Sequence, residues 1–220
     1  MKIYLPFLLL LIGHSVASHA TEDSLWVAEI RKLALAGDAD ALYSLGFMYD
    51  IGDGVPESDK TAVMWYTKAA ELGDVDAQFK LGVIYANGGG VPENDKMAVM
   101  WYTKAAEQGD ARAQTHLGLM YDIGDGVLEN DTTAVMWYTK AAELGEGRAQ
   151  YNLGLKYANG EGVPENDIKA YVWYALAKAN GFFWAKNNLE LLKQEMTKPQ
   201  IAKAQELAAK RHASGLKACD

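Results

Sequence analysis

The hydrophobic and small residues of this chain recur with a fixed spacing of 36 residues. Alanine occurs in five equivalent settings, at Ala41, Ala77, Ala113, Ala149 and Ala185. In the first four settings, Leu-Gly follows four residues later, tyrosine follows eight residues later, and a Trp-Tyr pair follows after 24 residues. Self-similarity at this period predicts an array of equivalent structural units.

Within each unit, the apolar positions have the spacing of α-helices. In the second unit, positions i, i+4, i+7 and i+8 of a first segment are Ala77, Leu81, Ile84 and Tyr85. A second segment has a similar apolar stripe, formed by Ala98, Trp101, Tyr102, Ala105 and Ala106. Such stripes predict two helices that each bury one face. The turn NGGGVPEND separates them, and its glycines permit the positive φ angles of a tight loop.

The ends of these helices are also marked in the sequence. Asp59, Asp95 and Asp131 stand at the starts of second helices, and we expect their carboxylates to cap the free N–H groups there. A glycine follows each second helix, where a left-handed conformation would end it: Gly37, Gly73, Gly109, Gly145 and Gly181. The small residues Gly82 and Ala105 predict a close approach of neighbouring helices.

Two short helices cannot bury their apolar stripes alone, so the units must stack. The sequence therefore predicts an all-α fold, a right-handed α/α solenoid of 36-residue helix-loop-helix repeats. We assign residues 21–40 to an N-terminal capping helix, residues 41–184 to four repeats, and residues 185–220 to C-terminal capping helices and a tail. The strict helical spacing of the Trp-Tyr pairs favours core packing over an aromatic cage.

The motif A-x-x-x-L-G-x-x-Y, G-x-G-V-P, D-x-x-x-A-x-x-W-Y-x-K-A-A-E-x-G resembles the Sel1-like repeat, a relative of the tetratricopeptide repeat. The resemblance covers about residues 38–181. The tail sequence TKPQIAKAQELAAK is similar to the terminal helix of exported bacterial members. Leu128 replaces the loop proline, and Ala175 and Leu176 replace the Thr-Lys pair of the other units. The resemblance implies an exported bacterial solenoid.

A second periodicity overlies the first. Units one and three share the sequence Tyr-Asp-Ile-Gly-Asp-Gly-Val, whereas units two and four share Tyr-Ala-Asn-Gly-x-Gly-Val. The loops between the two helices of successive repeats should therefore alternate between acidic and amide-rich sequences. The acidic loops at residues 50–59 and 122–131 lack the oxygen spacing of an EF-hand, so turn formation explains them.

Residues 1–20 have the pattern of a secretory signal peptide. Lys2 precedes the apolar run 5–12, and residues 18–20 form a small-x-small cleavage site, Ser-His-Ala. We expect a mature chain from Thr21 that is exported, periplasmic or secreted, and not inserted in a membrane after cleavage.

The net charge of the chain and its distribution indicate which kinds of partner the protein could bind. The chain has 21 Lys and Arg against 29 Asp and Glu, a net charge of -8, which argues against a nucleic-acid partner. Residues 21–184 carry 13 basic and 25 acidic residues, whereas residues 185–220 carry seven and four. This acidic array favours basic partner segments, or it serves only to keep the protein soluble.

Few residues of the mature chain suit catalysis or cofactor binding. Only His116 and His212 follow residue 20, so histidine metal sites and Ser-His-Asp triads lack most of their parts. Ser214 and Lys217 match the Ser-x-x-Lys motif of acylating serines, but they lie in the tail without companion motifs. Cys219 is the single cysteine, so a disulfide within the chain is impossible, and the sequence does not decide whether Cys219 forms a disulfide between two chains. We predict no metal, no cofactor and no enzymatic activity.

Two adjacent positions on the first helices vary between units while their neighbours do not. They are Tyr43, Ser44, Phe79, Lys80, Thr115, His116, Tyr151 and Asn152. First helices of stacked repeats usually line a concave face, so we predict that these residues bind a partner in that groove. Three of the four residues at the first position are aromatic, which favours binding over the alternative that all eight are unconstrained solvent positions.

The sequence thus predicts an exported, non-enzymatic scaffold that binds a protein or peptide through its concave face. One alternative is a β-lactam or cell-wall-linked hydrolase, an activity that the resemblance suggests through cysteine-rich family members; this chain lacks their paired cysteines. Another alternative is a structural assembly subunit, since the sequence does not define the oligomeric state.

Overall fold

The structure, a computed structural model, describes the backbone of residues 16–215 and the side chains of residues 25–215. The backbone so described is helical, without strands, and its elements are α1 (Val16–Leu35), α2 (Ala39–Ile51), α3 (Asp59–Glu71), α4 (Val75–Asn87), α5 (Asp95–Glu107), α6 (Ala111–Ile123), α7 (Asp131–Glu143), α8 (Gly147–Asn159), α9 (Asp167–Ala179), α10 (Ala185–Glu195) and α11 (Lys198–Ala213).

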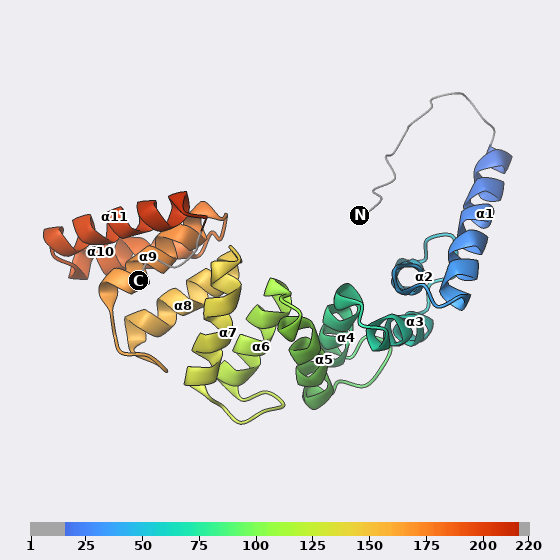
Figure 1. The fold of residues 1–220 in the computed structure, drawn as a ribbon, viewed down its shortest axis with the longest axis horizontal. Coiled ribbons are helices and arrows are strands. Elements are labelled where there is room, and N and C mark those ends of the chain that lie inside the picture. The colour runs from blue at the N-terminus through green and yellow to red at the C-terminus, as the bar shows by residue number, and fades with distance from the viewer. Residues whose placement is uncertain (1–15, 216–220) are drawn as a thin grey trace.

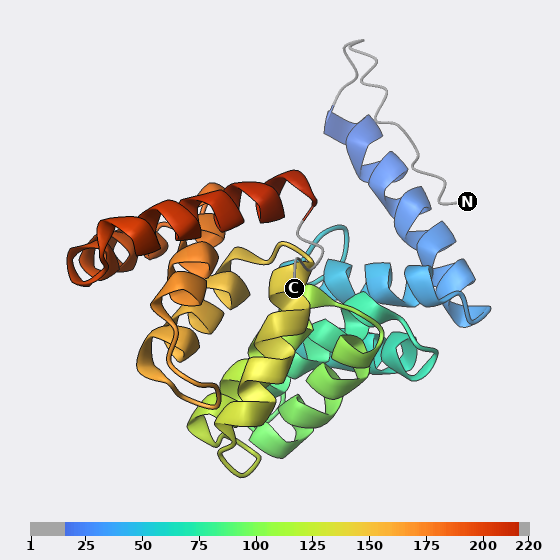
Figure 2. The ribbon, with the colours of Figure 1, turned by 60° about the vertical axis from the view of Figure 1, so that its left-hand side comes forward.

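From α1 to α10, each helix packs against the next one along the chain. Helices α2 and α3 form repeat 1, and the pairs α4–α5, α6–α7 and α8–α9 form repeats 2, 3 and 4. Each second helix packs against the first helix of its own repeat and, in repeats 1 to 3, against the first helix of the next repeat. The repeats follow an arc with α1 and α11 at its two ends (Figures 1 and 2). This is the all-α solenoid of 36-residue repeats that the sequence predicts.

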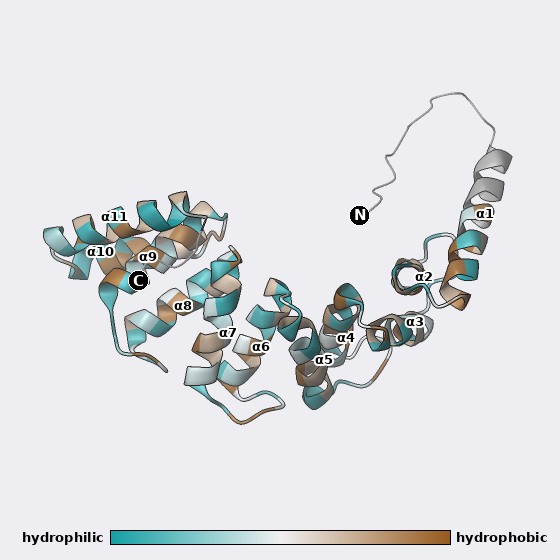
Figure 3. Cartoon of the chain, viewed as in Figure 1, coloured by the Kyte–Doolittle hydropathy of each residue, from teal (hydrophilic) through white to brown (hydrophobic). Residues whose placement is uncertain are grey.

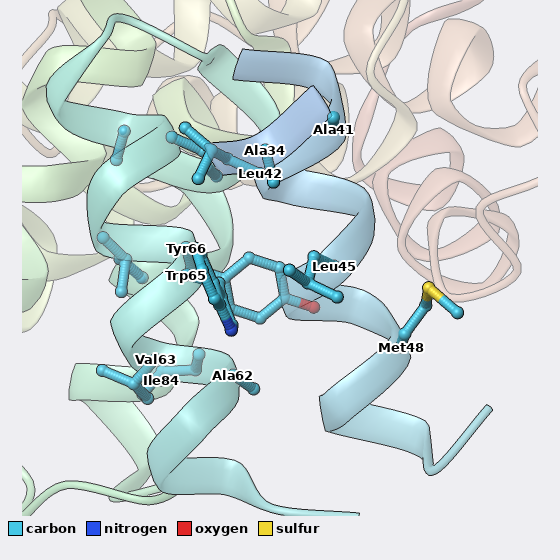
Figure 4. Packing of buried hydrophobic residues seen from close by; sticks show 14 of the residues in the cluster. Ala34, Ala41, Leu42, Leu45, Met48, Ala62, Val63, Trp65, Tyr66 and Ile84 are labelled. Atoms are coloured by element: carbon cyan, nitrogen blue, oxygen red, sulfur yellow. The ribbon is translucent and has the colours of Figure 1, made fainter. Parts of the chain in front are cut away.

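The core is a stripe that continues from repeat to repeat rather than a single centre. Figure 3 shows hydrophobic residues distributed along the whole array. The largest side chains with almost no exposed surface include one leucine and one tyrosine from each repeat: Leu45, Leu81, Leu117, Leu153, Tyr66, Tyr102, Tyr138 and Tyr174. The four tryptophans of the Trp-Tyr pairs are at most 9% exposed, which confirms that they belong to the core. Figure 4 shows Trp65 and Tyr66 of α3 beside Leu45 of α2.

Each first helix approaches its second helix through a glycine. A Cβ atom on Gly82 would lie 2.5 Å from ring carbons of Tyr102, and one on Gly118 would lie 2.7 Å from those of Tyr138. Gly46 and Gly154 have the same relation to the tyrosines of repeats 1 and 4. The close approach predicted for Gly82 is therefore confirmed, and it recurs in all four repeats.

A buried glutamine ties successive repeats together. The Nε2 atom of Gln78 in α4 donates a hydrogen bond of 3.1 Å to the carbonyl oxygen of Ala70, near the end of α3. Gln114 and Gln150 make the equivalent bonds to the preceding repeats at 3.0 Å. Each of these carbonyl groups also accepts a hydrogen bond from the N–H of the glycine that ends the helix, so the glutamine supplies a second donor that comes from the next repeat.

The predicted N-caps of the second helices are wrong by one residue. Asn94 caps α5, because its backbone is extended and its side chain accepts a hydrogen bond from the N–H of Met97. Asp95 is the first helical residue, where its negative charge is favourable near the positive end of the helix dipole. Ser58 and Asn130 likewise replace Asp59 and Asp131 as caps. The five glycines predicted to end helices have φ angles between 82° and 96°, which confirms their left-handed conformation.

The two ends of the array are closed by additional helices. α1 packs against α2, and both α10 and α11 pack against α9.

A cation covers the tryptophan ring of every repeat. In repeats 1 to 3 it is a lysine three residues after the tryptophan, as Lys104 lies over Trp101 at 4.3 Å. Leu176 occupies that position in repeat 4, and Arg211 of α11 covers Trp173 instead at 4.2 Å. The predicted signal peptide falls mainly on residues 1–15, and Cys219 on 216–220, both outside the described residues.

We expect Gly82→Ala to lower the free energy of unfolding by about 1–3 kcal/mol, because the new methyl group would force α4 away from the Tyr102 ring. A loss of stability would indicate a steric clash, since Gly→Ala within a helix otherwise raises the free energy of unfolding by about 1 kcal/mol. Urea denaturation followed by circular dichroism measures the change. Gly89→Ala is the control, because nothing lies within 4 Å of a Cβ atom there. A Gly82→Ala variant as stable as the wild type would contradict the tight packing.

Candidate binding surface

The predicted aromatic residues of the first helices lie against the repeated tyrosines of the second helices. The ring centroids of Tyr43 and Tyr66 are 5.5 Å apart, and those of Phe79 and Tyr102 are 5.9 Å apart. Tyr151 has the same relation to the tyrosine of repeat 4, at 5.8 Å. Tyr43, Phe79 and Tyr151 are half-buried, so part of each residue remains accessible. The guanidinium of Arg112 lies over the Phe79 ring at 4.4 Å, and the Tyr151 ring also contacts Phe182. Together they form a row with one aromatic residue per repeat in repeats 1, 2 and 4.

Thr115 does not belong to this row. It is only 3% exposed, and its hydroxyl donates a hydrogen bond to the carbonyl oxygen of Ala111 and lies 3.3 Å from a carboxylate oxygen of Glu146. Repeat 3 contributes His116 instead, which is stacked on Tyr102 with ring centroids 5.1 Å apart and meets the Phe79 ring edge-on at 5.7 Å.

The remaining predicted residues, at the second variable position, are held by polar contacts. Ser44 donates a hydrogen bond of 2.8 Å to the carbonyl oxygen of Asp40 within its own helix. The Nζ atom of Lys80 pairs with a carboxylate oxygen of Asp50 at 2.7 Å, which joins repeats 1 and 2. Asn152 makes a side-chain hydrogen bond to Tyr138.

Two aspartates that the sequence analysis did not single out individually complete these junctions. Asp50 accepts a hydrogen bond of 3.4 Å from the Tyr66 hydroxyl, and Asp122 accepts one of 3.2 Å from the Tyr138 hydroxyl. Burial, and then the neighbouring carboxylate, raise the pKa of both tyrosines, so both hydroxyls remain protonated donors. These aspartates belong to the Tyr-Asp-Ile-Gly-Asp-Gly-Val sequences of repeats 1 and 3, whereas repeats 2 and 4 have alanine at the same position.

Lys156 is a buried charge that sequence analysis missed. It is 5% exposed, and its Nζ atom contacts Asp122, pairs with Asp131 at 2.7 Å and pairs with Glu161 at 2.9 Å. Burial lowers the pKa of Lys156, but the hydrogen bonds to these three carboxylates outweigh it and raise the pKa above its usual value. The available signal was a lysine at a position that is methionine or isoleucine in the other repeats.

The environment of His116 favours a neutral ring. Burial, and then the positive charge of Arg148, lower the pKa of His116, whereas Asp110 raises it less strongly. The imidazole therefore serves near neutral pH as an uncharged, half-buried ring between repeats 2 and 3.

The structure gathers no catalytic set around the Ser-x-x-Lys motif in the part of the tail that it describes. Ser214 is exposed and donates a hydrogen bond of 3.0 Å to the carbonyl oxygen of Arg211. Lys217 lies outside the described residues. Within residues 25–215, no group of three or more His, Cys, Asp and Glu side chains is placed to hold a metal ion.

The stacked helix pairs, with one row of variable side chains along their first helices, define an α/α repeat solenoid. The Sel1 repeat matches four consecutive segments of the sequence, residues 39–74, 75–110, 111–146 and 147–182. The chain therefore belongs to the Sel1 repeat family, whose members are generally non-enzymatic and mediate protein-protein interactions.

Two solved structures are similar over most of the chain. One is c5321, a protective antigen present in uropathogenic Escherichia coli strains, with 34% identity and a TM-score of 0.75 over 88% of this chain. This chain spans 44% of that longer protein. The other is a Sel1 repeat protein from Oxalobacter formigenes, with 34% identity, a TM-score of 0.71, and coverage of 78% of this chain and 72% of that one. No curated protein matches the sequence.

We expect His116 to make the protein less stable as the pH falls from about 7.5 to 5. Because the pKa of His116 is lowered in the folded chain, the unfolded chain binds the proton more readily and stability is lost as the pH falls through 6.5. His116→Asn, which introduces the residue of repeat 4, should flatten this dependence in urea melts. The exposed His212→Asn should leave it unchanged. Parallel curves for wild type and His116→Asn would refute the assignment.

We expect Lys156→Met, which introduces the side chain found at Met120, to lower the free energy of unfolding by about 1–3 kcal/mol, because three carboxylates lose their shared cation. Lys80→Met removes a single, more exposed pair and should cost at most about 1 kcal/mol. Denaturant melts of both variants at neutral pH compare the two losses. Equal losses would show that burial of the Lys156 ammonium does not matter.

Proposed function

We propose that this protein is an exported, non-enzymatic scaffold that binds a protein or peptide along the first-helix face. The observation that carries the proposal is the row of half-buried rings, in which Tyr43, Phe79 and Tyr151 lie over tyrosines of the second helices. Partly exposed aromatic side chains with fixed positions bind partners well because little conformational entropy is lost on binding.

The spacing of the row supports an extended partner rather than a small molecule. Equivalent rings occur in repeats 1, 2 and 4, so one partner chain can engage several repeats at once. His116 provides the ring in repeat 3, where Thr115 is buried.

Export is supported by the signal-peptide pattern of residues 1–20 and places the scaffold in the periplasm or outside the cell. None of the helices in the described part of the chain is both long and apolar enough to cross a bilayer.

Loss of the ring row should abolish partner capture. The test is a cross-linked pull-down from envelope and culture-supernatant fractions with the chain from Thr21 and with a Tyr43/Phe79/Tyr151→Ala variant. We expect the wild type to enrich a defined partner and the variant to lose at least tenfold of it, because the rings supply the contact area. Circular dichroism melts establish that the variant is folded.

Met64, Met100 and Met136 provide a matched control. They occupy equivalent exposed positions on three second helices, so the triple Met→Ala variant removes apolar surface from a different face. Equal capture by both variants would place the binding surface elsewhere. Concentration-dependent self-association in sedimentation, without capture, would favour an assembly subunit. Turnover of a β-lactam that Ser214→Ala abolishes would favour the hydrolase.

A further inference from the structure

The tyrosine of repeat 2 differs from its three equivalents. The hydroxyls of Tyr66, Tyr138 and Tyr174 each have a side-chain hydrogen-bond partner, on Asp50, Asp122 and Asn188. Tyr102 is 2% exposed, yet its hydroxyl has no hydrogen-bond partner among the residues that the structure describes. It lines a cavity of about 240 Å³ between repeats 2 and 3. The Tyr102 hydroxyl is not enclosed by protein on all sides, so a ligand or water in the cavity can supply its hydrogen bond.

The sequence explains why the Tyr102 hydroxyl lacks a side-chain hydrogen-bond partner. Ala86 stands where repeats 1 and 3 place Asp50 and Asp122, and it lines the same cavity. The methyl group of alanine neither reaches the tyrosine hydroxyl nor fills the volume of a carboxylate. The cavity therefore lies at the place that the acidic side chain occupies in the neighbouring junctions.

Carboxylates line another part of this cavity. Asp95 is the first residue of α5, and Asp125 lies in the loop that follows α6. The loop is held on the start of α5, because a Cβ atom on Gly126 would lie 2.5 Å from the carbonyl carbon of Asp95. Within the described residues, neither carboxylate has an ion-pair partner. Glu93 adds a third acidic side chain to the lining.

The next junction shows what this arrangement of carboxylates holds. Asp131 and Glu161 lie 36 residues after Asp95 and Asp125, and the ammonium group of Lys156 bridges them at 2.7 and 2.9 Å. Met120 stands 36 residues before Lys156, so the central junction has two of the carboxylates without the internal amine.

The other walls of the cavity suit an aliphatic chain. Leu119, Met120 and Ile123 line it from α6, and the imidazole of His116 is stacked on the Tyr102 ring. An apolar wall beside two carboxylates and a hydroxyl matches the chemistry of a lysine side chain, which joins a hydrophobic stem to a compact cation.

We propose that the cavity between repeats 2 and 3 binds a lysine side chain of the partner, with its ammonium group between Asp95 and Asp125 and within reach of the Tyr102 hydroxyl oxygen. This inference rests on the proposed function and makes it more specific, because it requires the partner to place a basic residue at the centre of the array. The ammonium takes the place that the Lys156 amine fills in the next junction.

Titration with Nα-acetyl-lysine amide, followed by NMR of the His116 and Tyr102 rings in the labelled protein, tests the site directly. We expect saturable shifts, with binding at least tenfold weaker for Nα-acetyl-norleucine amide, which keeps the stem and lacks the charge. Added salt should weaken the lysine response because the contact is ionic. Equal responses to the two probes would overturn the proposal.

Met120→Lys is the sharpest variant, because it supplies the cavity with an internal amine like that of Lys156. It should weaken binding of the lysine probe at least tenfold while the midpoint of urea denaturation stays equal or rises. Asp125→Asn provides a second variant on an exposed loop residue and should also weaken the probe. Full binding by folded Met120→Lys or Asp125→Asn protein would overturn the site.

The pull-down separates this inference from the proposed function. A partner that is captured equally by wild type and Met120→Lys, but lost by the ring-row variant, would leave the scaffold function intact and remove the lysine site. A partner lost by both variants, together with selective binding of the lysine probe, would support both proposals.

Discussion

The contact between a first-helix glycine and a second-helix tyrosine ring determines the geometry of the whole array. In each repeat a Cβ atom on the glycine would lie 2.5 to 2.7 Å from the ring, so the glycine backbone lies directly against the tyrosine ring and no larger residue fits without a shift. The ring is thereby fixed beside the boundary with the next repeat. The Tyr66 hydroxyl donates to Asp50, which pairs with Lys80 of repeat 2, and the Tyr102 ring stacks on His116 of repeat 3. Both the packing of each repeat and the chemistry of each junction depend on this one contact.

The framework is constant, but the junctions it creates differ chemically. An ion pair occupies the first junction, through Asp50 and Lys80, and a buried lysine with three carboxylates occupies the third. The second junction has Ala86 and a cavity. In a solenoid each repeat contacts only its neighbours, so side chains at one junction can change without disturbing the others. Binding chemistry can therefore vary at little cost to the fold.

The 36-residue period was sufficient to predict the helices, the core and the terminating glycines, because these depend on local spacing and on burial that repeats identically. The caps were misplaced by one residue, since Asp95 and Asn94 are both good cap residues and only the backbone conformation distinguishes them. Lys156 was missed because its partner Asp131 lies 25 residues away, in the preceding repeat. Thr115 was included because sequence variation alone does not reveal that a small side chain is buried.

The acidic character of the array follows from the same repetition. Each repeat places an aspartate at the start of its second helix, where the helix dipole stabilises it. In repeats 1 to 3, the glycine-rich loop of the next repeat packs on this aspartate. Carboxylates from adjacent repeats are thus brought together and repel each other unless a cation separates them. Lys156 is that cation between Asp131 and Glu161, whereas Asp95 and Asp125 have none within the described chain. A basic partner residue at the central junction would supply the cation that Lys156 supplies at the next one.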